Sequence, residues 1–267
     1  MLLIDSHCHL DDKVYDRDRA AVIGRAREKL SAIITCAAEP KDFALTFALV
    51  KKYPGYVFAT AGVHPAAVKD YPDSALEKAR LEIAKNRAKI VGVGEIGLDY
   101  HWVKDELERR RQRELFDKML KLGRKLDLPV LVHLRSGLDK EQADAHLDAF
   151  EIMEKAGIKR AQLHMFGAKE LLPRALSNGW LISTNAICET SKVHKKIIAR
   201  VPLENLLLET DAPYLVPAAE KLRGIGRNEP AFVTHVCTKV AELKELKAEE
   251  VAVATARATR RFFGLRT

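Results

Sequence analysis

Residues 2–10 read LLIDSHCHL, a short apolar run that leads directly into an acidic residue and two histidines. Seven more apolar or β-branched runs follow, at 32–36, 57–61, 90–93, 130–132, 161–163, 180–184 and 206–208. Each is too short for a helix, so each predicts a buried strand. Stretches with helical spacing lie between them, at 17–30, 73–87, 105–126, 141–156 and 192–200 among others. This alternation predicts an α/β protein with a parallel sheet covered on both faces. At this length the leading form is a (β/α)8 TIM barrel, and an open doubly wound sheet is the alternative.

The rest of the chain fits one domain spanning residues 1–267. A loop at 212–228 follows the eighth run, and two helical segments, about 230–245 and 248–262, complete the sequence. Hydrophobic residues make up 47% and charged residues 31%, which excludes collagen-like and disordered chains. The net charge of +8 mildly favours polyanionic partners.

Cysteine usage and the N-terminus predict a cytoplasmic protein with no membrane association. Cys8, Cys36, Cys188 and Cys237 lie far apart and form no CxxC pair, which argues against a disulfide framework or a cysteine zinc site. Only residues 1–4 precede Asp5, too few for the core of a signal peptide. No apolar run approaches the roughly 20 residues that span a bilayer.

Side chains that can bind metals stand at the ends of many predicted strands. Asp5, His7 and His9 follow the first run. The others are His64 (GVHP), Glu95 (GEIGLD), His133 (VHLR), His164 (LHMFG) and Asp211 (ETDAP). The carboxyl ends of barrel strands meet at one mouth, where barrel enzymes keep their chemistry. We therefore expect these groups to converge there.

The spacing of His7 and His9 places both imidazoles on one face of an extended strand, where they can grip one ion. An HxH pair alone is a weak indication. Joined by Glu95, His133, His164 and Asp211, it supplies more ligands than one tetrahedral zinc needs, and suits two divalent ions that share a bridging carboxylate and a bridging hydroxide. The alternative is a set of rim histidines satisfied by hydrogen bonds, although burying six such groups without a metal is costly.

The ordered set DSHCHL, GVHP, GEIGLDY, VHLR, LHMFG, ETDAPYL and RNEP resembles the TatD family of metal-dependent deoxyribonucleases and hydrolases. The resemblance runs from residue 5 to the closing RRFFGL. It implies an amidohydrolase-type barrel with a site for two divalent ions. Mixed histidine and carboxylate sites accept Zn, Mn, Mg, Ni or Co, so the sequence does not identify the ion. The resemblance also implies which residues hold each ion. One ion would be held by His7, His9 and Asp211, and the other by His133 and His164. Glu95 would be a bridging ligand of both ions.

Four residues are candidates for binding the substrate. His64 is similar to a family histidine near the substrate phosphate, and a buried rim histidine is the alternative. Arg135 has the planar fork that clamps an anionic oxygen, or forms an exposed salt bridge. Asn228 and Glu229 in RNEP resemble a substrate-side motif of the family, and a helix cap with favourable first-turn charge explains them equally well.

Two carboxylates are candidates for supporting the ligands. Asp5 shares the face of the two first histidines and either orients an imidazole or caps the strand end. Glu209 stands two residues before Asp211, and we expect support from it rather than coordination. The glycines of GVGEIG at 92–97 do not match a nucleotide loop, and we expect them to allow close backbone approach around the glutamate they contain.

Other polar features are expected to be solvated. The run RRRQR at 109–113 and the histidines His146, His194 and His235 lie on predicted helices and are assigned to surface faces. The basic loop RGIGRNEP at 223–230 faces the same rim and could touch a phosphate backbone. An aromatic content of 6% gives no stacking stripe of the kind that binders of single strands use.

The function that these observations favour is hydrolysis of phosphodiester bonds in DNA, with a two-metal-activated hydroxide attacking phosphorus in line. Asp211 is the candidate proton shuttle and Glu95 the bridging catalytic carboxylate. The substrate expected from the sequence is DNA or another phosphate ester. The alternatives are a metal-dependent hydrolase of carbon esters or amides, for example an acyl-tRNA or a small amide, and a nucleic-acid-binding or scaffolding barrel with a vestigial site.

Overall fold

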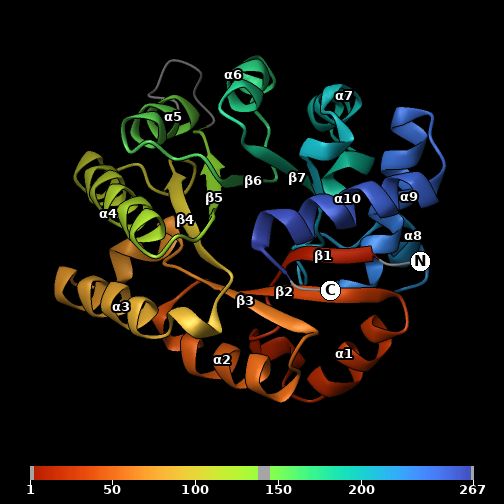
Figure 1. Cartoon of the computed structure of the whole chain (residues 1–267), viewed down its shortest axis with the longest axis horizontal. Helices are drawn as coiled ribbons and strands as arrows, with labels where there is room; N and C mark the ends of the chain where they lie inside the picture. The colour runs from red at the N-terminus through yellow and green to blue at the C-terminus, as the bar shows by residue number, and fades with distance from the viewer. Residues whose placement is uncertain (1–2, 138–144, 266–267) are drawn as a thin grey trace.

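The computed structural model describes residues 3–137 and 145–265, in which eight parallel strands follow one another in chain order (Figure 1). The strands are β1 (Leu3–Cys8), β2 (Leu30–Ala37), β3 (Val57–Ala61), β4 (Gly92–Asp99), β5 (Val130–Arg135), β6 (Ala161–His164), β7 (Leu181–Thr184) and β8 (Leu206–Leu208). Every neighbouring pair from β1 to β8 is parallel, as expected when helices connect the strands.

The segment that follows β8 closes the ring at its carboxyl mouth. The backbone N–H of Asp211 donates to the carbonyl of His7 at 3.0 Å, and the N–H of His9 donates to the carbonyl of Ala212 at 2.7 Å. These bonds join the last strand to the first through residues just beyond the regular ladder. The prediction of a (β/α)8 TIM barrel is confirmed.

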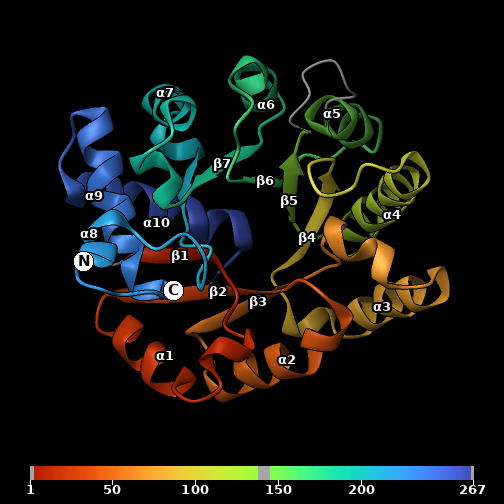
Figure 2. The ribbon, with the colours of Figure 1, turned by 180° about the vertical axis from the view of Figure 1, so that it is seen from behind.

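In the described part of the chain, the helices that connect successive strands lie outside the ring (Figures 1 and 2). They are α1 (Arg19–Arg27), α2 (Phe43–Lys52), α3 (Asp73–Lys85), α4 (Glu106–Lys125), α5 (Ala145–Lys155), α6 (Leu172–Ser177) and α7 (Lys192–Arg200). Three more helices follow β8, namely α8 (Ala218–Leu222), α9 (Val233–Lys244) and α10 (Ala248–Phe263). The predicted helices match these within a few residues, and the expected helical residues 141–144 lie outside the described part.

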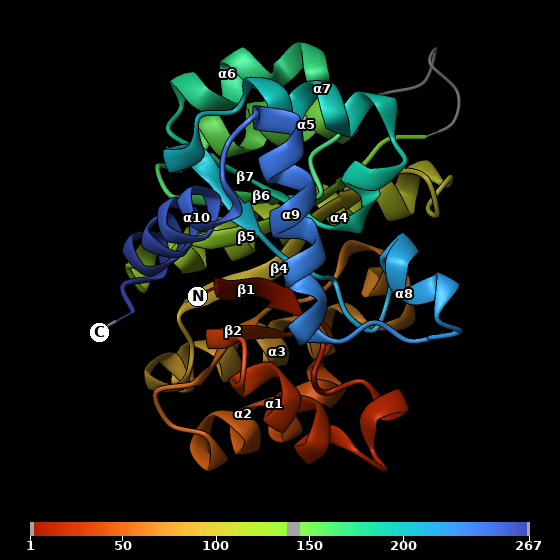
Figure 3. The ribbon, with the colours of Figure 1, turned by 90° about the vertical axis from the view of Figure 1, so that its right-hand side faces the viewer.

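Helix α10 covers the amino-terminal end of the barrel. Its Arg260 donates to the hydroxyl of Ser31 at the start of β2, and Phe263 packs beside Gly92 at the start of β4. In Figure 3, α10 and the short helix α8 lie on opposite sides of the strands. The polar residues at the carboxyl ends of the strands are therefore at the mouth that α10 leaves uncovered.

Two expectations about surface polarity are wrong in part. His146 is buried, with Nδ1 at 2.7 Å from the hydroxyl of Ser136, and His194 and His235 are only partly exposed. In RRRQR, the first arginine, Arg109, and Gln112 are buried because their positions, three apart, turn toward the barrel. Within residues 3–137 and 145–265, no helix combines the length and apolar character that crossing a bilayer requires.

Candidate metal centre

The six predicted metal ligands converge around Glu95, which lies inside β4 with its side chain 3% exposed. His7 comes from β1, His133 from β5 and His164 from β6, while His9 and Asp211 follow β1 and β8. Among the described residues, three overlapping groups could hold a cation, with ligand atoms within 4.8 Å of one another in each: His7, His9 and Asp211; His7, Glu95 and His164; His64, Glu95 and His133. The expected convergence at the mouth is present.

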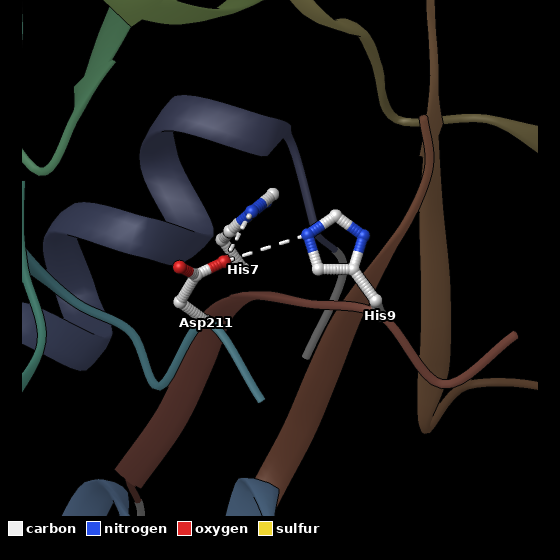
Figure 4. Close-up of side chains that lie close together, drawn as sticks. All are labelled: His7, His9 and Asp211. Atoms are coloured by element: carbon white, nitrogen blue, oxygen red, sulfur yellow. Dashed lines mark ion pairs between the residues drawn. The ribbon is translucent and has the colours of Figure 1, made fainter. Parts of the chain in front are cut away.

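The first group matches the ligand set implied for one ion. One oxygen of Asp211, Oδ1, lies 3.4 Å from Nε2 of His7 and 3.4 Å from Nε2 of His9 (Figure 4). The residue has a left-handed backbone conformation with φ 57°, which aspartate tolerates better than most residues. This conformation, together with its N–H bond to His7, places the carboxylate between the two imidazoles.

Glu95 joins the other two groups. Its Oε2 lies 3.6 Å from Nε2 of His7, and its Oε1 lies 2.9 Å from Nδ1 of His133. The rings of His133 and His164 stack with centroids 6.1 Å apart. The assignment of these two histidines to one shared ion stays a prediction, whereas the central position of Glu95 suits a bridging carboxylate.

Two further carboxylates hold the histidines from behind. Glu209 is fully buried and places Oε1 at 2.9 Å from Nδ1 of His164, as the expected supporting role requires. Asp99, which was not among the residues predicted from the sequence, places Oδ2 at 3.2 Å from Nε2 of His133. The indication was present in GEIGLD, because residues four apart on one strand share a face.

The electrostatics divide the histidines into charged and neutral groups. Burial disfavours the charge on His9, but the Asp211 and Glu95 carboxylates outweigh it and raise its pKa to about 9. Burial likewise opposes the charge on His164, and Glu209 with Asp211 raises its pKa to about 10. Burial lowers the pKa of His7, and the nearby positive charge of His164 adds to that effect.

The surroundings of His7 indicate whether the site fits a cation. Both of its ring nitrogens are buried and make no hydrogen bond among the described residues. Buried polar atoms normally have partners, and a neutral imidazole beside two carboxylates is a typical ligand of a divalent metal. The donor set therefore fits such an ion, and the fit rests on an atom that the protein itself leaves unsatisfied.

His64 is oriented toward the centre by the turn that follows it. Its Nδ1 accepts the N–H of Ala66 at 3.1 Å, so the proton of the neutral ring sits on Nε2, which lies 3.6 Å from Oε1 of Glu95. Burial and the neighbouring His133 lower its pKa to about 4, so the ring is neutral at pH 7. This arrangement leaves an N–H donor at the mouth.

Asp5 and Asn228 hold backbone rather than imidazoles. Asp5 accepts the N–H and the hydroxyl of Thr210 at 2.9 and 2.6 Å, which ties β1 to the segment after β8. The side-chain amide of Asn228 donates to the carbonyls of Thr210, Tyr214 and Leu215 at 3.0, 2.6 and 3.1 Å. Both residues therefore fix the loop that carries Asp211.

Two other predicted substrate residues have different surroundings. Glu229 is buried and binds the guanidinium of Arg25 through both oxygens, at 2.9 and 2.7 Å. Arg135, the last residue of β5, forms no ion pair within the described ranges, and its Cζ lies 5.4 Å from the ring centre of Trp102. Glu229 is placed to support the loop, and Arg135 lies at the rim.

Close backbone packing surrounds Glu95, as expected from the glycines of β4. A Cβ on Gly97 would collide with the carbonyl of His133, and one on Gly94 would come within 2.5 Å of the carbonyl of Leu131. The sulfur of Cys36 lies 3.1 Å from the Glu95 N–H and 3.2 Å from the Gly94 carbonyl. These contacts fix the backbone that presents the central carboxylate.

Comparisons with known proteins agree over nearly the whole chain. A family model described as TatD related DNase matches residues 4–264. An uncharacterized metal-dependent hydrolase of Methanocaldococcus jannaschii is 35% identical over 261 residues, which cover 97% of this chain and 96% of that protein. The 3′-5′ ssDNA/RNA exonuclease TatD of Erwinia tasmaniensis is 31% identical over 271 residues, which cover 98% and 100%. The crystal structure of the Escherichia coli TatD homologue YjjV matches with a TM-score of 0.86 at 31% identity, covering 99% of this chain and 98% of that one.

Proposed function

The chain belongs to the family of TatD-related DNases, and from this membership we propose that it is a metal-dependent hydrolase that cleaves phosphodiester bonds in DNA. One observation carries the proposal. Among the described residues, three groups of histidines and carboxylates overlap at the open mouth of the barrel, linked through His7 and Glu95, and the buried His7 has no protein hydrogen-bond partner for either ring nitrogen.

The number of ligands in the cluster suits two divalent cations. His7, His9 and Asp211 would hold one, His133 and His164 would hold the other, and Glu95 would reach both. Cations held there would lower the pKa of a bound water and neutralise charge on the phosphate oxygens. Glu209 and Asp99 would keep two of the imidazoles oriented through the nitrogens they contact.

His64 and Arg135 are the groups placed to bind the phosphate. The Nε2–H of His64 points to the cluster from a neutral ring, so it can donate a hydrogen bond without competing for the cation positions. Arg135 lies at the rim with its guanidinium free of ion pairs within the described part of the chain, and its fork matches two phosphate oxygens. Asn228 and Glu229 would act indirectly, through the loop they hold.

Asp211 is the carboxylate best placed to take up a proton. Its side chain is 14% exposed, against 3% for Glu95, so water reaches it more readily. Burial opposes ionisation, but the positive charge of His164 and the close ring nitrogens of His7 and His9 lower the pKa of Asp211. Proton uptake at Asp211 therefore requires neutral imidazoles around it, which is also the state in which they bind a cation.

The test is metal-dependent cleavage of a labelled DNA oligonucleotide by chelator-stripped protein. We expect no cleavage before a divalent ion is added, and recovery with at least one of Mg²⁺, Mn²⁺, Co²⁺, Ni²⁺ or Zn²⁺. The variant His133→Ala/His164→Ala should lose activity with every ion. His235→Gln, which changes a histidine on α9 outside the cluster, should keep it.

Two results would refute the proposal. One is cleavage that persists without metal, and the other is full activity of the double variant. A parallel assay with an aryl ester separates the phosphodiesterase from a carbon-ester hydrolase, because the same ligands polarise a carbonyl as readily as a phosphoryl group. Faster turnover of the ester would contradict the phosphodiester assignment.

A further inference from the structure

Two aromatic side chains differ from the others in being largely exposed to solvent. Of the two Trp, six Tyr and nine Phe residues, all within the described ranges, only Trp102 and Tyr214 are exposed, by 64% and 55%. Large exposed aromatic rings lose favourable burial unless something covers them. Both rings lie at the mouth that carries the metal-ligand cluster.

Trp102 is fixed to the cluster through its backbone. It lies three residues beyond the end of β4, and its N–H donates to Oδ1 of Asp99 at 2.9 Å. The other oxygen of the same carboxylate lies 3.2 Å from Nε2 of His133. The indole also lies beside the guanidinium of Arg135, so an aromatic face and a positive charge are presented together.

Tyr214 is fixed to the other side of the cluster. Its N–H donates to the carbonyl of Asp211 at 2.9 Å, and its ring lies 5.9 Å from the ring of His9, centre to centre. Its hydroxyl lies 3.3 Å from Oδ2 of Asp12, and its carbonyl accepts the side-chain amide of Asn228. The ring is therefore held by its surroundings while more than half of it stays open to solvent.

The order of the strands places the two rings on opposite sides of the mouth. Trp102 follows β4 and contacts the last residue of β5, whereas Tyr214 follows β8 and contacts the residue after β1. In a ring of eight strands in chain order, the β4–β5 side lies across from the β8–β1 side. The metal ligands lie between them.

We infer that Trp102 and Tyr214 stack on bases of a single-stranded nucleic acid that flank the phosphate bound at the cluster, an inference that rests on the proposed function. Every base offers a flat face, so stacking binds a strand without reading its sequence. The bases of a duplex are already stacked and paired, so their faces are unavailable to the two rings. The pair would thus select single strands.

Binding by metal-free protein tests this inference without cleavage. The probe is a fluorescently labelled oligothymidylate, and an abasic strand of the same length is the matched ligand. We expect Trp102→Ala and Tyr214→Ala each to weaken binding of the oligothymidylate by about 5-fold or more, and to show a much smaller effect on the abasic strand. Trp102→Phe and Tyr214→Phe keep a ring and should retain most of the affinity. Leu81→Ala changes an exposed apolar residue of α3 that is not part of the cluster or of the aromatic pair; it is the control and should bind like the unchanged protein.

Tryptophan fluorescence gives an independent readout. The other tryptophan, Trp180, is fully buried, so quenching on addition of the unlabelled strand reports on Trp102. Quenching that is lost with the abasic strand supports stacking. Equal loss of affinity for both strands in the alanine variants, or no quenching at saturation, would overturn it.

Cleavage by the metal-loaded protein is scored separately, so the two proposals can fail independently. Base-dependent binding without cleavage under any metal would refute the nuclease and leave the stacking intact. The opposite outcome is a Trp102→Ala/Tyr214→Ala variant that cleaves DNA and binds both strands as tightly as the unchanged protein. That result would refute the stacking and leave the nuclease proposal intact.

Discussion

Proton release on metal binding gives a direct test of the electrostatics of the cluster. With pKa values of about 9 and about 10, His9 and His164 are protonated in the metal-free protein at pH 7. A metal ligand must be a neutral imidazole. Addition of a divalent cation at pH 7 should therefore release about two protons from these rings.

The same pKa values set the size of the effect. Deprotonating a group two pH units below its pKa costs about 3 kcal/mol, and three units below costs about 4 kcal/mol. These two rings alone should make the logarithm of the apparent binding constant rise by about two for each pH unit just above pH 7. Burial opposes a charge on His133, but Asp99 and Glu95 raise its pKa, so any proton on that ring adds to the slope. At pH 9 His9 is half neutral, so the release from these rings should fall by about half a proton.

Isothermal titration of Mn²⁺ into chelator-stripped protein measures this release, when it is repeated in buffers of different ionisation enthalpy. His235→Gln should leave the proton count unchanged, because its imidazole contacts Glu220 instead of the cluster. His64→Gln should also leave it unchanged, because that ring, with a pKa of about 4, is neutral at pH 7. A count near zero at pH 7 would show that the imidazoles are neutral before the metal arrives, and would refute the reasoning.

The metal-free protein should also lose stability in alkali. The folded-state pKa of His9 lies above its value of about 6.5 in an unfolded chain, so its contribution is complete below about pH 6.5 and disappears as the pH rises through about 9. His164 extends the loss toward pH 10. Urea unfolding of metal-free protein between pH 7 and 10 checks this, and a constant midpoint would contradict it.

Substitutions of Gly97, Glu209 and Cys36 probe the support of the centre. Gly97→Ala should destabilise the fold by about 3 kcal/mol, because Gly97 has φ 146° and its new Cβ would collide with a carbonyl of β5. Gly24→Ala is the control: this position of α1 has open space around it, so alanine should stabilise the helix slightly. Urea unfolding measures both changes. Glu209→Gln should weaken metal binding by about 10- to 100-fold in a chelator competition, and unchanged affinity would contradict a supporting role. Cys36→Val should cost about 1–3 kcal/mol of unfolding free energy because it leaves the N–H of Glu95 without its sulfur partner, and Cys36→Ser should recover part of this loss.

The sequence predicted the ligands because the topology does most of the positioning. In a parallel barrel all carboxyl strand ends meet at one mouth, so residues as distant as His7 and Asp211 approach once each is assigned to a strand end. Two residues of the cluster therefore need not be close in sequence. The assignment of individual ligands to individual ions needs side-chain directions, and apolar patterns do not contain these.

The supporting residues were harder to predict because their partners come from helices and loops. Gln112 lies in a run of arginines that is typical of a solvated face, yet its side chain accepts the N–H of Asp99 at 3.0 Å and donates to the carbonyl of Pro65 at 3.0 Å. The rotation of α4 about its axis decides this, and a charged run does not reveal that rotation. Trp102 and Tyr214 were also not predicted from the sequence. They are 112 positions apart, and only the closure of the barrel brings them to opposite sides of one mouth.

The errors in the predicted strand ends are themselves informative. β2 runs one residue past its predicted end, to the apolar Ala37. Apolar runs end where a strand enters the polar mouth, and β1, β4, β5 and β6 continue past the ends predicted for them into polar residues. Each of these four extensions contains a residue of the cluster: His7, Glu95, His133 and His164 in turn. By contrast, β3 and β8 end where predicted, and their contributions to the mouth, such as Asp211, come from the loops beyond. A strand that outlasts its apolar run in a barrel of this kind therefore carries its functional side chain within the ladder, where backbone hydrogen bonds on both sides hold it more rigidly than a loop can.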